Sequence, residues 1–234
     1  MQLTFASYNI HKAVGLDRRR DPDRILSVLR EIGADVIALQ EADRRFGSRE
    51  SVLQRAAIDE HTPWKVVPVG MRPLSMGWHG NALLVRRDIE VIAARAVPLP
   101  TLEPRGAICA DLEVMDQRLR VVGMHLDLSG LRRRHQIEAI CRHAEGQLPC
   151  PTVMMGDLNE WSAEAGALRA FAGDLTVLAP GRSFPARRPM AQLDRVIVSP
   201  DWTVEALGVH HSALSAVASD HLPVWARLQL NDAA

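Results

Sequence analysis

The sequence predicts one α/β domain built on two layered, mixed β-sheets. Apolar strand patterns and amphipathic helix patterns alternate along the whole chain, as expected for sheets that are covered by helices. No repeat, low-complexity tract or linker-like segment interrupts this alternation, so we assign residues 1–234 to a single domain. With 47% hydrophobic and 24% charged residues, the composition is that of an ordinary globular protein with an ample core.

Strands and helices alternate in the first third of the chain. The opening run "LTFASYNI" alternates apolar and small polar residues and predicts a strand. Asp21 and Pro22 then form an N-cap and first-turn pair, apolar residues follow at helical spacing, and Gly33 ends the helix. The nearly apolar run "DVIALQE" predicts a buried strand, which a helix over 51–60 and the strand "WKVVPV" follow.

The rest of the chain is richer in strands. Strand patterns with short turns such as 115–117 between them cover residues 80–87, 89–99, 106–114 and 118–128. A helix is expected from Leu131, because one helical face carries Ile137, Ile140, Cys141, Ala144 and Leu148. The remaining expected elements are a strand at 151–159, a short helix at 163–171, and strands at 193–200, 204–212 and 221–230.

Charge and cysteine content exclude several classes of protein. Acidic and basic residues balance at 28 each, which argues against a protein that binds duplex DNA chiefly by charge. The three cysteines lack CxxC spacing, so neither a disulfide framework nor a zinc site is predicted. The N-terminus shows no signal-peptide pattern and no apolar run is long enough to span a membrane, so a cytoplasmic protein is the expectation.

Several predicted strands are apolar along their length and strongly polar at one end. Four of them finish in the pairs Asn9 and His11, Gln40 and Glu41, His125 and Asp127, and Asp157 and Asn159. Two later strands instead begin with such residues, Asp194 in one and Asp220 with His221 in the other. Ligands bind at the carboxyl ends of strands in α/β folds, and an antiparallel strand can begin at that same edge. The sequence therefore predicts one site at this edge of the sheets.

These segments resemble the endonuclease/exonuclease/phosphatase superfamily, whose fold is that of pancreatic deoxyribonuclease. The matching motifs occur in the family's order and are "YNIH", "LQE", "GNALLVRR", "RGA", "GMHLD", "GDLNEW", "LDRVIVS" and "SDHLPV". The resemblance implies a four-layered α/β sandwich, with two mixed β-sheets face to face and helices on the outside. It also implies a magnesium-dependent phosphoesterase, and most directly a phosphodiester hydrolase with a metal-assisted, Asp-activated water.

A metal site is predicted from oxygen ligands. Mg²⁺, with Mn²⁺ as a substitute, is usually held by one or two carboxylates together with waters and substrate phosphate. Glu41 is the best candidate, because a carboxylate that ends so apolar a strand is otherwise unfavourable. By the family resemblance, Asn9 assists through its carbonyl oxygen and Asp220 belongs to the same ionic cluster.

The catalytic residues are assigned chiefly by the resemblance. Asp157 and Asn159 are two residues apart on an extended segment, so their side chains emerge on the same face. A carboxylate there can orient or deprotonate a water molecule, and the neighbouring amide can donate a hydrogen bond to a phosphate oxygen. The alternative is that Asp157 and Asn159 are ordinary turn residues whose side chains hydrogen-bond the local backbone. The resemblance further implies that Asp194 orients His221 as an imidazolium, and that His125 is a second phosphate-facing histidine.

Other polar residues carry weaker signals. Asn81 resembles an asparagine at the floor of the family's cleft, and Arg105 is a candidate phosphate clamp, with a plain surface arginine as the alternative. Surface positions are expected for the arginine runs 18–20, 132–134 and 187–188 and for His135 and His143, and core positions for Trp161 and Trp225. His11 and His79 either line the cleft or face solvent.

The substrate is left open among nucleic acid, a phospholipid headgroup and a small phosphodiester, with intact duplex DNA not preferred. The loop "GMRPLSMGWHG" places Met71, Met76 and Trp78 where they either contact an apolar substrate group or form a buried loop. The alternative function is a catalytically silent binding module that retains the fold. The presence of all the expected acidic and histidine residues argues against that module.

Overall fold

Two six-stranded sheets form the centre of the computed structural model, which describes residues 1–44, 47–69, 73–101, 105–162, 165–171 and 173–231. The first sheet has the strand order β11 (Trp202–Val209), β12 (Val224–Leu230), β1 (Gln2–Asn9), β2 (Val36–Gln40), β4 (Ala82–Arg86) and β3 (Trp64–Val66). The second has the order β5 (Glu90–Val97), β6 (Gly106–Val114), β7 (Gln117–His125), β8 (Thr152–Asp157), β10 (Asp194–Val198) and β9 (Thr176–Leu178).

Both sheets are mixed, as the sequence predicts. In each sheet the parallel pair is central, β1 with β2 in one and β7 with β8 in the other, and the other pairs are antiparallel. Parallel neighbours require a crossover connection. α1 (Pro22–Ile32) and α3 (Gly130–Glu145) provide these two crossovers.

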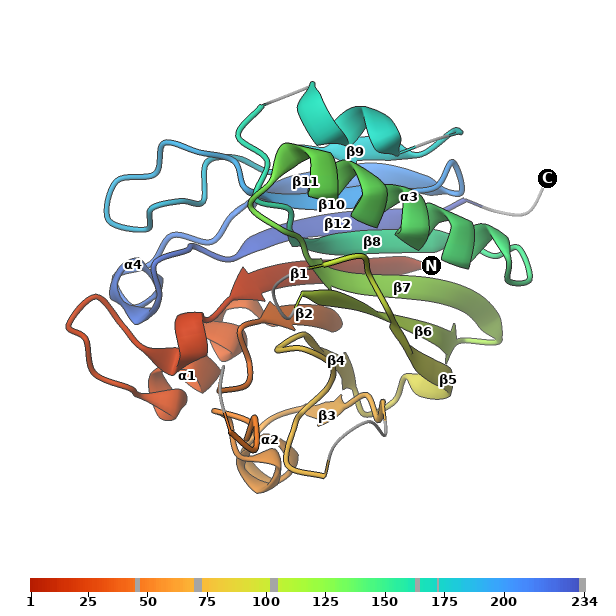
Figure 1. Ribbon diagram of the computed structural model, residues 1–234. Helices are drawn as coiled ribbons and strands as arrows, with labels where there is room; N and C mark the ends of the chain where they lie inside the picture. The colour runs from red at the N-terminus through yellow and green to blue at the C-terminus, as the bar shows by residue number, and fades with distance from the viewer. Residues whose placement is uncertain (45–46, 70–72, 102–104, 163–164, 172, 232–234) are drawn as a thin grey trace.

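Helices lie on the outside of the two sheets, so the molecule has four layers (Figure 1). α1 and α2 (Arg55–His61) pack against the first sheet through residues such as Leu29 and Ile58. α3 packs against the second sheet through Ile137 and Ile140. The remaining short helices are two 3-10 turns, η1 (His11–Ala13) and η2 (Gly166–Ala170), and α4 (Ser215–Ala218). This architecture is the predicted sandwich.

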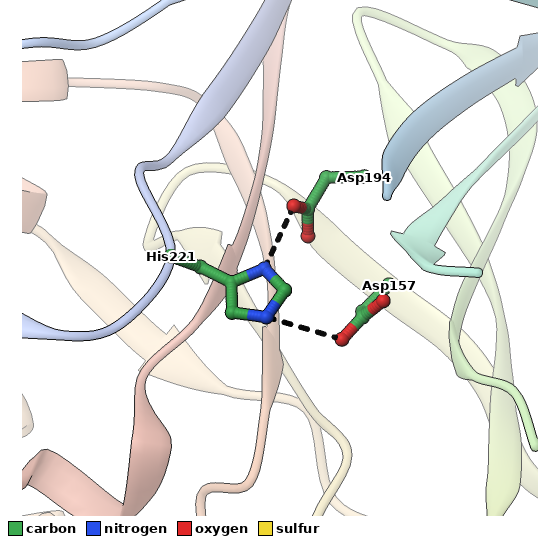
Figure 2. Close-up of side chains that lie close together, drawn as sticks. All are labelled: Asp157, Asp194 and His221. Atoms are coloured by element: carbon green, nitrogen blue, oxygen red, sulfur yellow. Dashed lines mark hydrogen bonds and ion pairs between the residues drawn. The ribbon is translucent and has the colours of Figure 1, made fainter. Parts of the chain in front are cut away.

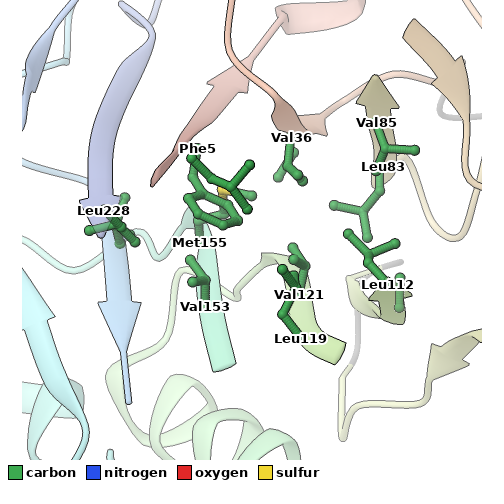
Figure 3. Close-up of a cluster of buried hydrophobic side chains, with 14 of the residues drawn as sticks. Phe5, Val36, Leu83, Val85, Leu112, Leu119, Val121, Val153, Met155 and Leu228 are labelled. Carbon is green, nitrogen blue, oxygen red and sulfur yellow. The ribbon is translucent and has the colours of Figure 1, made fainter. Parts of the chain in front are cut away.

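A third cluster of apolar side chains joins the two sheets face to face (Figure 3). Phe5 and Val36 of the first sheet pack in one core with Val121, Val153 and Met155 of the second. Burying apolar surface is the main favourable contribution to folding. Because this core fixes one sheet against the other, it also fixes the relative positions of side chains at the sheet edges.

The first helix begins and ends where its caps predict. Asp21 accepts a hydrogen bond from the backbone N–H of Arg24 at 3.0 Å, and Pro22 is the first helical residue. Gly33 ends the helix in the left-handed conformation with φ of 61°, which glycine adopts without steric cost. The predicted helix at 51–60 is shorter at its start, because residues 51–54 precede α2 in an irregular segment.

Two predictions on and after α3 are wrong. Leu148 does not continue the apolar face, because the helix ends at Glu145 and the Leu148 side chain is 68% exposed. Arg133 is buried rather than on the surface, since its guanidinium pairs with Glu160 at 3.1 Å. The neighbouring His135 is exposed, as predicted.

Two tryptophans that the sequence places in the core differ in the structure. Trp225 is partly buried against the first sheet's outer core, whereas Trp161 is 65% exposed, so its predicted core position is wrong. In the loop before β4, Met76 is fully buried and Trp78 packs partly buried on the inter-sheet core, which favours the buried-loop interpretation. Met71 lies outside the described residues, as does the start of the helix predicted at 163–171.

Within the described part of the chain, no helix combines the length and the apolar character that crossing a bilayer requires.

Candidate active site

The polar strand ends predicted from the sequence meet at one edge of the two sheets. In the parallel pairs, Asn9 of β1 lies opposite Gln40 of β2, and His125 of β7 lies opposite Asp157 of β8. Asp194 begins the antiparallel strand β10 and pairs in register with Asp157. The face-to-face packing of the sheets then brings the two edges together, so that Asn9 and Asp157 form a hydrogen bond from different sheets at 3.0 Å.

The centre of this edge is a buried histidine between two buried aspartates (Figure 2). Nδ1 of His221 lies 2.9 Å from an oxygen of Asp194, and Nε2 lies 3.6 Å from an oxygen of Asp157. His125 approaches the same Asp157 oxygen at 3.4 Å. Asp194 therefore holds the ring of His221 from one side, and the other nitrogen is directed toward Asp157.

The two carboxylates make His221 a strong base. Burial alone would lower the pKa of this imidazole, but the charges of Asp194 and Asp157 outweigh it and raise the pKa of His221 to about 10. Burial opposes the ionisation of Asp157 as well, yet the charge of His221 and the hydrogen bonds from His125 and Asn9 hold the pKa of Asp157 well below its usual range. At neutral pH the cluster therefore contains an imidazolium beside an ionised Asp157.

Asp157 and Asn159 form a local turn and also face the site. One oxygen of Asp157 accepts a hydrogen bond from the backbone N–H of Asn159 at 2.9 Å, and Asn159 has φ of 52°. The side-chain amide of Asn159 donates to the carbonyl of Leu126 at 3.0 Å. The turn interpretation and the site interpretation of "GDLN" thus describe the same geometry, since the turn aims the second Asp157 oxygen at the histidines.

The three predicted metal ligands lie around this centre. Asn9 donates its amide to Asp157 and accepts from the backbone N–H of His11 at 3.1 Å through its carbonyl oxygen. Glu41 is 23% exposed and pairs with the ammonium of Lys12. Asp220 is 37% exposed and lies 4.0 Å from Nδ1 of His11.

The surroundings of Glu41 favour the ionised form of its carboxylate. Its burial opposes the charge, but the charge of His125 and the hydrogen bond from Lys12 prevail and lower the pKa of Glu41. Ionised carboxylate, amide carbonyl and half-exposed carboxylate oxygens are donors that suit a hard cation such as Mg²⁺. These residues therefore fit a magnesium ion by donor chemistry.

A second group of donor atoms suits a metal less well. Asp157, Asp194 and His221 each offer an atom within 4.8 Å of the others, and they form such a group of three among the described His, Cys, Asp and Glu residues. However, both ring nitrogens of His221 face carboxylates. An imidazolium has no free lone pair, so this cluster fits proton transfer and phosphate binding better than metal ligation.

The predicted substrate-binding residues occupy different surroundings. Nη1 of Arg105 lies 2.9 Å from Nδ1 of His125, which places its positive charge at the edge of the cluster. Asn81 is buried, and its amide donates to the backbone carbonyl of Gly106 at 3.0 Å. That bond ties the loop before β4 to the start of β6 next to Arg105.

Some residues at the site were missed by the sequence interpretation. Lys12 carried no motif signal although it pairs with Glu41. Phe184 packs its ring 4.8 Å from the ring of His221, and the exposed Trp161 contacts Phe184 edge to face at 6.3 Å. Trp161 directly follows "GDLNE", so its position in the motif could have indicated a place beside the site.

Comparison with known proteins identifies the family of this chain. The sequence profile of the Endonuclease/Exonuclease/phosphatase family matches residues 6–221. The uncharacterized protein YbhP of Escherichia coli K12 is 28% identical over 249 aligned positions, which cover 95% of this chain and 94% of that protein.

Solved structures share the fold at low sequence identity. A humanized D. rerio TDP2 superposes with a TM-score of 0.76 and 16% identity, covering 97% of this chain and 99% of that one. A mannosyl-6-phosphatase of Bacteroides thetaiotaomicron superposes with a TM-score of 0.75 and 19% identity, covering 97% of this chain and all of that one. D. rerio TDP2 has also been solved with a single-strand DNA product, at a TM-score of 0.75 and 14% identity, covering 97% of this chain and 99% of that one.

Proposed function

Because the chain belongs to the endonuclease/exonuclease/phosphatase family, we propose that it is a divalent-metal-dependent hydrolase that cleaves a phosphodiester with water. The observation that carries this proposal is the buried cluster of His221, Asp194 and Asp157, with His125 beside it. Such a cluster combines a fixed imidazolium with an ionised carboxylate. These are the groups that phosphoryl chemistry needs to bind a phosphate oxygen and to align a nucleophile.

The histidines bind the phosphate in this proposal. His221 is held as a cation by Asp194, so it donates a charge-assisted hydrogen bond to a phosphate oxygen. His125 on β7 lies against the same Asp157 oxygen as His221, and Arg105, just before β6, lies beside His125, so both add donors. Their combined charge stabilises the extra negative charge that develops on the phosphate as it is attacked.

Asp157 acts on the attacking water. A carboxylate with so low a pKa is a weak base, so its first role is to orient the water through an accepted hydrogen bond. When Nε2 of His221 turns from its ion pair with Asp157 to a hydrogen bond with the phosphate, Asp157 loses part of a cationic interaction and its basicity rises. Substrate binding thus makes Asp157 a better proton acceptor.

Asn159 binds the phosphate in this proposal. One hydrogen of its side-chain amide is donated to the carbonyl of Leu126, and the other is left to donate to a phosphate oxygen.

The metal site is assigned to Glu41, Asn9 and Asp220. Bound Mg²⁺, or Mn²⁺ in its place, supplies neutralising charge to the phosphate and the leaving oxygen. An oxygen-only set of ligands selects such hard ions over zinc. Glu41→Ala should therefore weaken the metal dependence while the fold is retained.

The substrate is proposed to be single-stranded nucleic acid, a lipid headgroup or a small diester rather than intact duplex DNA. The chain has no net charge, whereas duplex binders gain affinity from a broad basic surface. The exposed Trp161 beside Phe184 offers instead a short aromatic surface next to His221. Two solved structures of the same fold are consistent with this choice, since one holds a single-strand DNA product and the other is a mannosyl-6-phosphatase.

A panel of phosphodiesters, phosphomonoesters, nucleic acids and lipids, with and without Mg²⁺, tests the proposal. Asp157→Asn should lower kcat by at least ~10²-fold, the usual scale of acid–base assistance, with substrate binding retained. Asp111→Asn is the matched control, because Asp111 is also buried but pairs with Arg118 and Arg120 away from the site.

Four results would contradict parts of the proposal. Full activity in excess chelator would refute the metal dependence. Near wild-type turnover in Asp157→Asn would refute the assignment of that residue. Inactivity on the whole panel, with binding intact, would favour the silent binding module, and a higher kcat/KM on duplex DNA at fixed salt would overturn the substrate assignment.

A further inference from the structure

The turn that follows β1 has an unusual backbone. His11, Lys12 and Ala13 all have positive φ values of 45°, 57° and 59°. Residues other than glycine seldom adopt this left-handed region, and each costs of order 1 kcal/mol or more. Three in succession persist only when the surrounding structure holds them, and such strain gathers at functional sites.

Backbone hydrogen bonds hold the turn rigidly on both sides. The N–H of Ala13 donates to the carbonyl of Ile10 at 2.7 Å, and the N–H of Asp21 donates to the carbonyl of Ala13 at 2.8 Å. Nε of Arg20 donates to the carbonyl of Lys12 at 3.2 Å. The base of the Lys12 side chain is therefore fixed in place, unlike that of a typical surface lysine.

The turn serves each of the three side chains assigned to the metal. The backbone N–H of His11 donates to the side-chain oxygen of Asn9 at 3.1 Å. Nδ1 of His11 hydrogen-bonds the backbone carbonyl of Val14 at 3.0 Å and lies 4.0 Å from Asp220. The ammonium of Lys12 pairs directly with Glu41, with exposed fractions of 28% and 23%. The turn thus lies next to all three side chains, and Lys12 is its cation in direct contact with an oxygen that a hard metal ion would use.

We propose that Lys12 is a positioning residue that sets the metal affinity of the site by competing with the divalent cation for the carboxylate of Glu41. This inference rests on the proposed function, because it requires Glu41 to be a metal ligand. An ammonium and a metal ion cannot both occupy the space against one carboxylate oxygen, and their like charges repel. The pair keeps Glu41 oriented toward the site, and the metal must displace it in order to bind.

Removing the ammonium should therefore tighten metal binding. In Lys12→Met the stem of the side chain is kept and the competitor is lost, so we expect the Kd for Mn²⁺ to fall about tenfold, which corresponds to ~1.4 kcal/mol. Lys12→Arg keeps a cation and should stay near the wild-type Kd. The chain contains one other lysine, Lys65 on the edge strand β3, whose Nζ donates to the backbone carbonyl of Arg87, so Lys65→Met is the matched control.

The experiment is a titration with Mn²⁺ alone, followed by electron paramagnetic resonance of the free ion and by calorimetry, on the folded full chain. Thermal unfolding without metal and with metal provides a second readout, in which Lys12→Met should have the lower Tm without metal and the larger gain on addition. A merely structural ion pair would lower both Tm values and leave the Kd unchanged.

The outcomes distinguish a failure of the role proposed for Lys12 from a failure of the proposed metal site. If Glu41→Ala abolishes Mn²⁺ binding and Lys12→Met binds no tighter than wild type, the role of Lys12 is refuted and the metal site stands. If wild type binds no Mn²⁺, or Glu41→Ala binds it as wild type does, the assigned metal site fails and the competition fails with it.

Discussion

Replacing Asp194 with asparagine removes one of the two charges that hold His221 protonated, while it leaves the shape of the side chain intact. The structure places this carboxylate 2.9 Å from Nδ1 of His221, closer than Asp157 is to Nε2. A neighbouring opposite charge at such distances changes a pKa by about 1 to 3 pH units. In Asp194→Asn we expect the pKa of His221 to fall from about 10 by roughly two pH units.

The same pair makes the stability of the protein depend on pH. The folded-state pKa of His221 is raised above its ordinary value of 6.5, so protonation favours the folded state. The contribution is fully present below pH 6.5, and it is lost as the pH rises toward 10. At about 1.4 kcal/mol per pH unit, the contribution of His221 is at most roughly 5 kcal/mol. Burial raises the pKa of Asp194, and this unfavourable shift of the partner offsets part of it.

Two measurements check this reasoning. Nuclear magnetic resonance of the His221 ring, assigned with His221→Gln, gives the pKa in wild type and in Asp194→Asn. Urea unfolding between pH 6.5 and pH 10 should show a free energy of unfolding that declines steeply in wild type and less in the variant. The reasoning is refuted if His221 titrates near 6.5 in wild type, or if Asp194→Asn leaves its pKa unchanged.

Three other substitutions have expected outcomes that the structure fixes. Gly156→Ala would bring a Cβ atom to 1.9 Å from the backbone carbonyl oxygen of Met124. Urea unfolding should therefore show a free energy of unfolding that is lower by ~3 kcal/mol or more. An unchanged midpoint would contradict the close spacing of β7 and β8. Arg133→Met removes the cation paired with the buried Glu160, which keeps hydrogen bonds from the backbone N–H groups of Ser162 and Ala167. The change should cost ~3 kcal/mol in thermal unfolding, whereas the exposed Arg134→Met should be neutral. Trp161→Ala should change stability by less than ~0.5 kcal/mol but raise KM about tenfold if the ring stacks on substrate; an unchanged KM would remove it from the site.

The fold could be predicted from local patterns because each strand and helix carries its own signal. Alternation located the strands, and Asp21 and Gly33 located the ends of α1. The helix pattern failed at Leu148, since periodicity does not show where a helix stops and the chain turns at Gly146. The three-residue strand β9 was missed because so short a segment has no periodicity to detect.

The site was predictable where it lies on strand ends and not where it depends on loops. Strand pairing alone brings Asp157 beside His125 and Asp194, so their juxtaposition follows from the order of apolar and polar residues. Arg133 looked like one of three equivalent surface arginines, and its partner Glu160 became visible only in the folded chain. Lys12 reaches Glu41 from a left-handed turn that contains no glycine, so the sequence carries no signal for that turn.

The pairing of β1 with β12 constrains the order of events during synthesis. β1 leaves the ribosome well before its hydrogen-bonding partner β12, which lies more than 200 residues later in register, with Gln2 opposite Gln229. One edge of β1 therefore waits unpaired until β12 has emerged, a period in which the exposed edge could pair with another nascent chain. Asn9 at the end of β1 and His221 just before β12 approach the same oxygen of Asp157 only after β12 has emerged. A ribosome-bound chain stalled before β12 would therefore be inactive, with the second sheet free to form ahead of the first.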